Sequence, residues 1–235
     1  MSGPKALLLV FSEVGSRVPT EEYHDWYNNE HIPLRVNTST FSSWARFQEI
    51  DGLKPVYAAY YDLESVESTK IPPYSQLAET RSEREKTIMA NLDLVDRRLY
   101  ESYTGPSLRP SSLYNPRQTA RYTVLVETEV KPEAEEDFNR WYDEEHIPML
   151  AKVPGWVRSR RFVLKEDGVM GVEGLKRTEA PPKHLAVHEW ATQEKLESDA
   201  YKQAMSTPWR TKVLESVVRK TRREMELYKQ WTRDD

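Results

Sequence analysis

The feature that most restricts the fold of this chain is an internal duplication. The octet WYNNEHIP at residues 26–33 recurs as WYDEEHIP at residues 141–148, and six of the eight positions are identical. The same separation of 115 residues aligns Arg46 with Arg161. Because a period above 100 residues is too long for a solenoid repeat, we expect two copies of one domain.

Each copy shows the same succession of patterns. An apolar run predicts a first strand, and a helix with acidic residues in its first turn follows. We expect this helix to end near Ile32 and Ile147, because the residue before a proline avoids the α-helical region. Two strands, a long helical stretch and a short last strand then complete the βαββαβ order of a ferredoxin-like unit. The long helices and last strands are predicted at 76–93, 97–103, 192–218 and 222–228.

The fold class predicted from this order is α+β, with two tandem ferredoxin-like units. The first unit is expected at residues 1–104, a linker rich in proline and serine at 105–119, and the second unit at 120–235. The second copy carries an insertion at 168–183, which indicates either a lid or a disordered tip.

Composition excludes several classes of chemistry. The 235 residues include no cysteine, so disulfides and thiolate catalysis are excluded. The eight glycines form no phosphate-binding motif, and the five histidines are scattered, so we expect neither a cofactor nor a metal site. A net charge of −4 argues against nucleic-acid and membrane partners. With no apolar run long enough for a membrane helix and no targeting segment, a cytoplasmic protein is expected.

The repeated Trp-Tyr-x-x-Glu-His-Ile-Pro octet, followed by an aromatic residue and then Arg-Phe, resembles the EthD family of the dimeric α/β-barrel superfamily. The resemblance implies two ferredoxin-like units with their sheets face to face, here as an intramolecular dimeric α/β-barrel. That superfamily includes cofactor-free lyases, aromatic cyclases and monooxygenases, together with haem-dependent enzymes. A fold shared by so many chemistries does not select one of them.

Histidines are the first candidates for catalysis. His31 and His146 are each placed at the end of the first helix of a copy, and an imidazole titrates near neutral pH, which suits proton transfer. The structural alternative is a helix cap that donates to terminal carbonyls. His188 lies on the predicted third strand, aligned with Tyr60. It could converge with His146 and supply a general acid and a general base.

Aromatic and basic residues complete the candidate site. Tyr142 is placed to stabilise an oxyanion, although it could equally belong to the core. An arginine fork suits a substrate carboxylate, but a solvated edge is the structural alternative. The substrate-binding candidates are Arg161, Arg158, Trp141, Trp156, Trp190 and Tyr27. We expect the octet glutamates, Glu30 and Glu145, to pair with Arg46 or Arg161.

The second copy is the expected working site, because it holds the insertion, the additional arginines and His188. The preferred function is a cofactor-independent lyase or cyclase of secondary metabolism, which would dehydrate, decarboxylate or cyclise an aromatic or polyketide-like molecule. The alternatives are a cofactor-free anthrone- or quinol-type monooxygenase and a non-catalytic small-molecule-binding protein. The expected partner is a hydrophobic aromatic substrate, and the protein is expected to be a monomeric pseudo-dimer or a homodimer.

Overall fold

The computed structural model of the protein describes residues 5–232. Contacts between residues divide the chain into two compact units. Unit 1 contains the residues up to 102 together with 164–181 and the residues from 228 onward, and unit 2 contains 103–163 and 182–227. Two strands therefore begin in unit 2 and end in unit 1.

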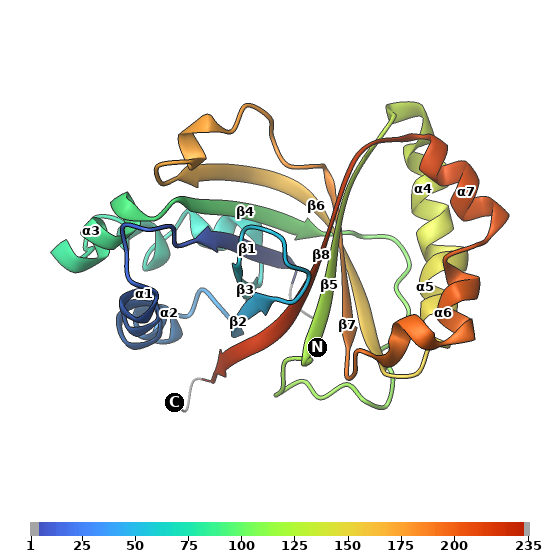
Figure 1. The fold of residues 1–235 in the computed structure, drawn as a ribbon, viewed down its shortest axis with the longest axis horizontal. Helices are drawn as coiled ribbons and strands as arrows, with labels where there is room; N and C mark the ends of the chain where they lie inside the picture. Colours follow the sequence, from blue (N-terminus) through green and yellow to red (C-terminus); the bar gives the residue numbers. More distant parts are fainter. Residues whose placement is uncertain (1–4, 233–235) are drawn as a thin grey trace. The chain divides into compact units, whose positions relative to one another are not determined.

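Unit 1 is a sheet with its helices on one face (Figure 1). The sheet order is β4-β1-β3-β2, all antiparallel, and the ends of β6 and β8 extend it beside β4 and β2. The elements are β1 (Ala6–Glu13), α1 (Thr20–Trp26), α2 (Ile32–Val36), β2 (Trp44–Glu49), β3 (Tyr57–Leu63), α3 (Glu83–Asn91) and β4 (Leu94–Ser102).

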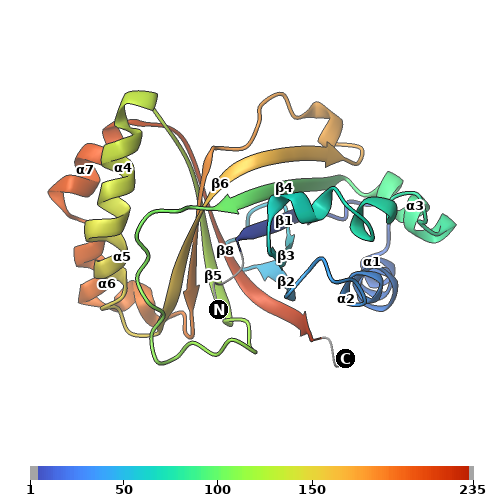
Figure 2. The same ribbon diagram turned by 180° about the vertical axis from the view of Figure 1, so that it is seen from behind.

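Unit 2 repeats this arrangement with a layer of helices against its sheet (Figure 2). Its sheet order is β8-β5-β7-β6, again antiparallel, so the first strand of each half lies between the last and the third. The elements are β5 (Tyr122–Val130), α4 (Glu135–Trp141), α5 (Ile147–Leu150), β6 (Trp156–Met170), β7 (His184–Trp190), α6 (Asp199–Ala204), α7 (Pro208–Glu215) and β8 (Val217–Trp231). The predicted mixed α+β class is confirmed.

The first helix of each copy does not end at its isoleucine, so that prediction is wrong. A π-helical turn covers Tyr27–His31 and Tyr142–His146, and the helix continues beyond Pro33 and Pro148. A proline inside an ordinary α-helix clashes with the carbonyl four residues earlier. The wider turn, in which the Ile147 N–H bonds to the Tyr142 carbonyl five residues back, carries the chain past this obstacle.

The second half differs from its predicted boundaries in two places. The helical stretch expected at 192–218 is divided into a 3-10 turn and the two short helices α6 and α7. The last strand then covers Val217–Trp231 instead of 222–228. Pairing with β5 keeps the charged segment 219–226 extended, since the ladder satisfies its backbone groups while its side chains alternate between faces.

Most of the insertion at 168–183 belongs to unit 1, which contains it up to Pro181. Strand β6 extends to Met170, and the backbone N–H groups of Val172 and Glu173 then donate to the carbonyls of Leu92 and Asp93. Gly171, with φ of 91°, allows this close approach, because a Cβ atom there would lie 2.7 Å from the Leu92 carbonyl oxygen. Met170 contributes to a cavity of unit 1.

Each unit has its own apolar core between helices and sheet. Trp26, Tyr23 and Phe41 are buried in unit 1, and Phe138 and Trp141 are buried in unit 2. Each core includes the aromatic residues of its octet, so the duplicated motif is first of all a packing motif. Among residues 5–232, no helix is long and apolar enough to cross a membrane.

Candidate functional site

The π-helical turn of unit 2 fixes the position of His146. In an α-helix, residues five apart point in different directions. The wider turn instead stacks the imidazole of His146 on the indole of Trp141, with ring centroids 4.3 Å apart and planes inclined by 22°. Tyr142 approaches the same imidazole edge-on at 5.3 Å. The octet therefore holds His146 rigidly within the helix–sheet layer.

The hydrogen bonding of His146 leaves one nitrogen unused. Its Nδ1 is buried and has no hydrogen-bond partner among the described residues, and the nearby backbone of Ala204 acts to raise the pKa of the ring. We assign the proton of the neutral ring to the other nitrogen, Nε2. Nδ1 of the neutral ring then carries a buried lone pair, which is the atom a general base requires.

His188 shows the complementary arrangement. Its Nδ1 lies 2.8 Å from the hydroxyl of Ser159, which already accepts the indole N–H of Trp156 at 3.0 Å. The Ser159 proton finds an acceptor only if it is donated to His188 Nδ1, so we assign the His188 proton to Nε2. This Nε2–H is buried without a partner among the described residues. His188 therefore offers a donor where His146 offers an acceptor.

The two histidines line one small cavity of unit 2. Their ring centroids are 6.0 Å apart and their planes are nearly perpendicular, so a single ligand atom can contact both. The cavity has a volume of about 80 Å³. Its lining residues are Val124, Val126, Trp141, Tyr142, His146, Leu150, His188, Trp190, Tyr201, Met205, Arg210, Lys220 and Arg222. The predicted convergence of His146 and His188 is thus present.

The position of His188 corrects one alignment. His188 pairs with Val124, and in unit 1 the residue that pairs with the equivalent cavity-lining Leu8 is Tyr61. The counterpart of His188 is therefore Tyr61, whereas Tyr60 lies on the opposite face of its strand. The error of one residue arose because the helices and the first strands of the two copies follow slightly different offsets.

Three cations face this cavity, and its lining contains no carboxylate. Arg210 donates from one guanidinium nitrogen to the Met205 carbonyl at 2.9 Å, and Arg222 pairs with Glu224 at 2.6 Å. The side chain of Lys220 has no hydrogen bond or ion pair within the described residues, although part of the residue is exposed. Desolvation by the surrounding groups lowers the pKa of Lys220, and the neighbouring Arg210 and Arg222 lower it further.

The predicted substrate-binding arginines are bound to internal partners instead. Arg161 pairs with Asp143 at 2.9 Å and with the Asn139 side chain, and it packs against Tyr142 and Tyr103. Since Asp143 is the third residue of the octet, this pair holds the helix to β6.

Arg158 points to the other face of β6, where it pairs with Glu189 at 2.7 Å and donates to the Tyr114 hydroxyl. Trp156 is buried and contacts Ser159 rather than the cavity. Neither of these two candidates lines the cavity.

Two further expectations about side chains are wrong. Glu30 accepts a hydrogen bond from Ser82, and Glu145 accepts from the Trp141 indole at 3.2 Å, so neither octet glutamate holds Arg46 or Arg161. Each lies at the face of its helix that meets the following helix. The position of these glutamates makes them structural links between helices.

Unit 1 has an equivalent cavity of about 70 Å³, in which the histidine and the two tyrosine hydroxyls have hydrogen-bond partners within the protein. Nδ1 of His31 lies 3.1 Å from the buried carboxylate of Glu85, and as a carboxylate only accepts, Nδ1 is the donor. The hydroxyls of Tyr27 and Tyr61 are hydrogen bonded to each other at 2.8 Å. His31 and Tyr27 therefore both line this cavity, with their polar groups directed at protein partners.

Burial keeps the histidines of both cavities neutral. Desolvation is the main cause that lowers the pKa of His31 and of His188 to about 3, with nearby arginines acting in the same direction. Desolvation also lowers the pKa of His146 well below its usual value, and His188, Arg210 and Lys220 lower it further. Burial raises the pKa of Tyr142 to about 12, so its phenol keeps its proton.

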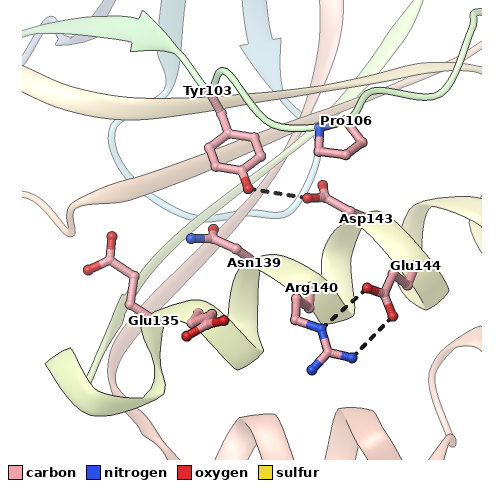
Figure 3. Close-up of a pocket in the computed structure, with 8 residues that line it drawn as sticks. Tyr103, Pro106, Glu135, Asn139, Arg140, Asp143 and Glu144 are labelled. Carbon is pink, nitrogen blue, oxygen red and sulfur yellow. Dashed lines mark hydrogen bonds and ion pairs between the residues drawn. The ribbon is translucent and has the colours of Figure 1, made fainter.

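A second hollow lies on the outer face of α4 (Figure 3). This open depression of about 540 Å³ is lined by charged and polar side chains, and the Tyr103 hydroxyl donates to Asp143 at 3.2 Å beside it. Arg140 and Glu144 form an ion pair along the helix at its other side. Among residues 5–232, no group of three or more acidic or histidine side chains is arranged to hold a metal ion.

Sequence analysis missed the residues that complete the unit 2 cavity. Ser159 is an ordinary strand serine, and its role depends on pairing with His188 across the β6–β7 ladder. Arg210 lay within the long helix predicted at 192–218, so its place in the cavity could not be recognised. Lys220 and Arg222, two residues apart, form the one signal that was available, because alternation in a strand would have placed both on a single face.

No protein-family model matches the chain, and no curated protein matches its sequence. Solved structures share its fold over nearly the whole length. An anthrone oxidase-like protein has a TM-score of 0.60 at 14% identity and covers 100% of this chain and 95% of its own. A protein from Lactobacillus acidophilus NCFM, described provisionally as a monooxygenase, has a TM-score of 0.55 at 13% identity over 99% and 97% of the two chains.

A variant of the chlorite dismutase from Candidatus Nitrospira defluvii has a TM-score of 0.53 at 9% identity and covers 96% of this chain and 93% of its own. At such low identities the comparisons establish a shared fold. Membership of the EthD family is not shown by these comparisons.

Proposed function

We propose that unit 2 is the active site of a cofactor-free oxygenase acting on a small enolisable aromatic molecule. The observation that carries this proposal is the pair of buried neutral imidazoles, which present a lone pair on His146 and an N–H on His188 to one largely apolar cavity. The fold shared with an anthrone oxidase-like protein favours this alternative over the lyase or cyclase expected from the sequence.

The proposed reaction begins with proton transfer. His146 Nδ1 removes a proton from a methylene carbon next to an aromatic carbonyl, and the electron pair moves into the ring system as an enolate. His188 Nε2–H donates a hydrogen bond to the enolate oxygen and stabilises the charge. Tyr142, whose raised pKa keeps its phenol protonated, lies beside both rings and supplies a second neutral polar group.

The enolate then reacts with molecular oxygen, which is the oxidant. Its carbon forms a bond to O2, and the proton held by the imidazole passes to the outer oxygen to give a hydroperoxide. Loss of the second proton from the same carbon and cleavage of the O–O bond give a carbonyl and one water. The methylene is oxidised by four electrons, and one O2 is reduced to the carbonyl oxygen and water.

The cavity must widen to admit such a substrate. Its 80 Å³ lies well below the roughly 300–1,000 Å³ of pockets that enclose drug-sized ligands. Tyr201 and Met205 cover it from the short helix α6 and its end, and both are only partly buried. We infer that displacement of these two side chains opens the site.

Turnover of a panel of enolisable aromatic ketones, measured under air and under nitrogen, tests the proposal. Consumption of one O2 per product, abolished under nitrogen, is the expected result. Replacement His146→Ala should lower kcat/KM by about 10²-fold or more. The matched control is His24→Gln, which removes a half-buried histidine of unit 1 that lies outside the cavities.

Other outcomes select the alternatives. Turnover that is equal under air and nitrogen but lost in His146→Ala would favour the lyase or cyclase, because both begin with the same proton transfer. Saturable binding without turnover would leave a binding protein. An oxygen-dependent rate unchanged by His146→Ala would refute the assignment of the base.

The finer fold assignment belongs to the same proposal. The identical strand order of the two halves supports a pair of tandem ferredoxin-like units. The intramolecular barrel, the boundaries 1–104 and 120–235, a catalytic role for His31, the oligomeric state and a cytoplasmic location stay predictions.

A further inference from the structure

The two units cap their last helices in the same way. In unit 2, Thr207 begins α7, where its hydroxyl accepts the backbone N–H of Arg210 at 3.1 Å and donates to Glu145 at 2.5 Å. In unit 1, a serine at the equivalent place begins α3, accepts the N–H of Glu85 at 2.9 Å and donates to the other octet glutamate, Glu30. Glu85 and Arg210 therefore occupy the same position of the repeated fold.

The charge at this position is reversed between the units. In unit 1 the Glu85 carboxylate is almost fully buried, lies 3.1 Å from His31 Nδ1 and 3.6 Å from Arg81 Nε, and interacts electrostatically with Arg35. It therefore satisfies the histidine and offsets the cations of the cavity. Glu85 does not itself line the cavity, but it is the internal anion bonded to the histidine that does.

Unit 2 lacks such an anion. Arg210 replaces the glutamate, Lys220 adds a second cation with no acidic partner, and His146 Nδ1 has lost the residue that would bind it. Cations beside an apolar wall are poorly solvated, so a bound anion gains more there than at an open surface. Lys220 and Arg222 belong to the cavity lining and are also exposed, so an anion in solution can reach them.

We propose that the ligand of unit 2 is an aromatic carboxylate, whose carboxylate group pairs with Arg210 and Lys220 of the cavity lining. This inference rests on the proposed function for the reaction that follows binding. It assigns the anion site to residues other than Arg158 and Arg161, which already have internal partners.

The proposal connects binding to catalysis. In the empty cavity Arg210 and Lys220 contribute to the low pKa of His146, after burial itself. A bound carboxylate offsets both positive charges, so it raises the basicity of the imidazole that must take the proton. A substrate with a carboxylate would thus make His146 a stronger base, whereas a neutral analogue would not.

Calorimetric titration with benzoate and with the neutral isostere benzamide tests the anion site without any turnover. Benzoate should bind saturably and at least 10-fold more tightly than benzamide. Arg210→Glu should weaken benzoate binding at least 30-fold, and Lys220→Gln about 10-fold. The matched control is Lys212→Gln on the outer face of α7, where Kd should change less than 2-fold.

A second measurement uses unit 1. Glu85→Ala should create an unfilled anion site between His31 and Arg81, so acetate should raise its Tm saturably, while acetamide and chloride at equal concentration should not. If Glu85→Ala fails to fold, Glu85→Gln removes the charge at nearly the same volume and is tested identically. Benzoate affinity equal to that of benzamide, or unchanged in Arg210→Glu, would overturn the proposal.

These outcomes separate the two proposals. Carboxylate-selective binding without oxygen consumption would leave the anion site standing and remove the oxygenase. Oxygen-dependent turnover of neutral ketones, with no preference for their carboxylated analogues, would support the oxygenase and remove the anion site.

Discussion

All four buried histidines should make this protein acid-labile well above the pKa of its carboxylates. Burial is the first cause that lowers the pKa of His31 and His188 to about 3 and that of His184 to about 4, and it lowers the pKa of His146 as well. In the unfolded chain each returns to about 6.5. The unfolded state therefore binds more protons between these values, and stability falls as pH decreases through this window.

The size of the effect follows from linkage. A histidine with a pKa of 6.5 unfolded and about 3 folded costs about 2 kcal/mol between pH 7 and pH 5, so His31 and His188 together cost about 4 kcal/mol. His184 and His146, whose pKa values burial also lowers, add to this cost. A typical domain is stable by about 5–15 kcal/mol. We therefore expect cooperative acid unfolding with a midpoint near pH 5.

Urea unfolding at a series of pH values, followed by tryptophan fluorescence, measures this loss. The free energy of unfolding should be highest above pH 7 and should fall with a limiting slope near 5 kcal/mol per pH unit, or about 1.4 for each histidine. His31→Asn should reduce the slope by about one histidine's share, whereas His24→Gln, which removes a half-buried ring, should reduce it least. A constant urea midpoint from pH 7 to pH 5 would refute the account of buried neutral imidazoles.

Two further replacements test individual contacts. Ser159→Ala removes the hydroxyl that fixes the His188 tautomer, and should lower kcat about 10-fold with little change in KM. Ser159→Thr keeps a hydroxyl and should retain activity. Steady-state kinetics of the two variants test this, and equal rates for alanine and threonine would contradict it. Glu85→Ala leaves His31 and Arg81 unpaired, and should destabilise the protein by about 3–5 kcal/mol in urea unfolding. Glu85→Gln, which removes the charge but keeps the volume, should also destabilise it, and wild-type stability of Glu85→Gln would contradict an electrostatic role.

The repeated octet predicted more of the fold than any other feature, because it marks a buried element in each half. Trp26 and Trp141 are buried in equivalent places, and the elements around them follow the predicted order. Boundaries failed where tertiary pairing overrode local preference. The segment 217–221 directly follows α7, and its ladder with β5 shows that the last strand already begins there.

The candidate site was predictable where it depended on periodicity. His146 and His188 meet because one lies on a helix and the other on the strand face beneath it. The arginines failed for a different reason. Arg161 is on the expected face, but its charge is already used by Asp143, and partners 18 residues apart cannot be identified from residue type alone.

The duplication itself explains why the two halves need different functional descriptions. Selection on packing keeps the octet in both units, since its aromatic residues fill the cores, whereas nothing in packing fixes the sign of the charge at the fourth position of the capped helix, counted from its cap. At this position the Glu85 carboxylate of unit 1 bonds to His31, whereas Arg210 of unit 2 adds a positive charge to the cavity lining. One exchange of a carboxylate for a guanidinium thus converts a self-satisfied cavity into one that requires an anion from outside, while the hydrogen bonds that hold the helix, from Ser82 and from Thr207, stay the same.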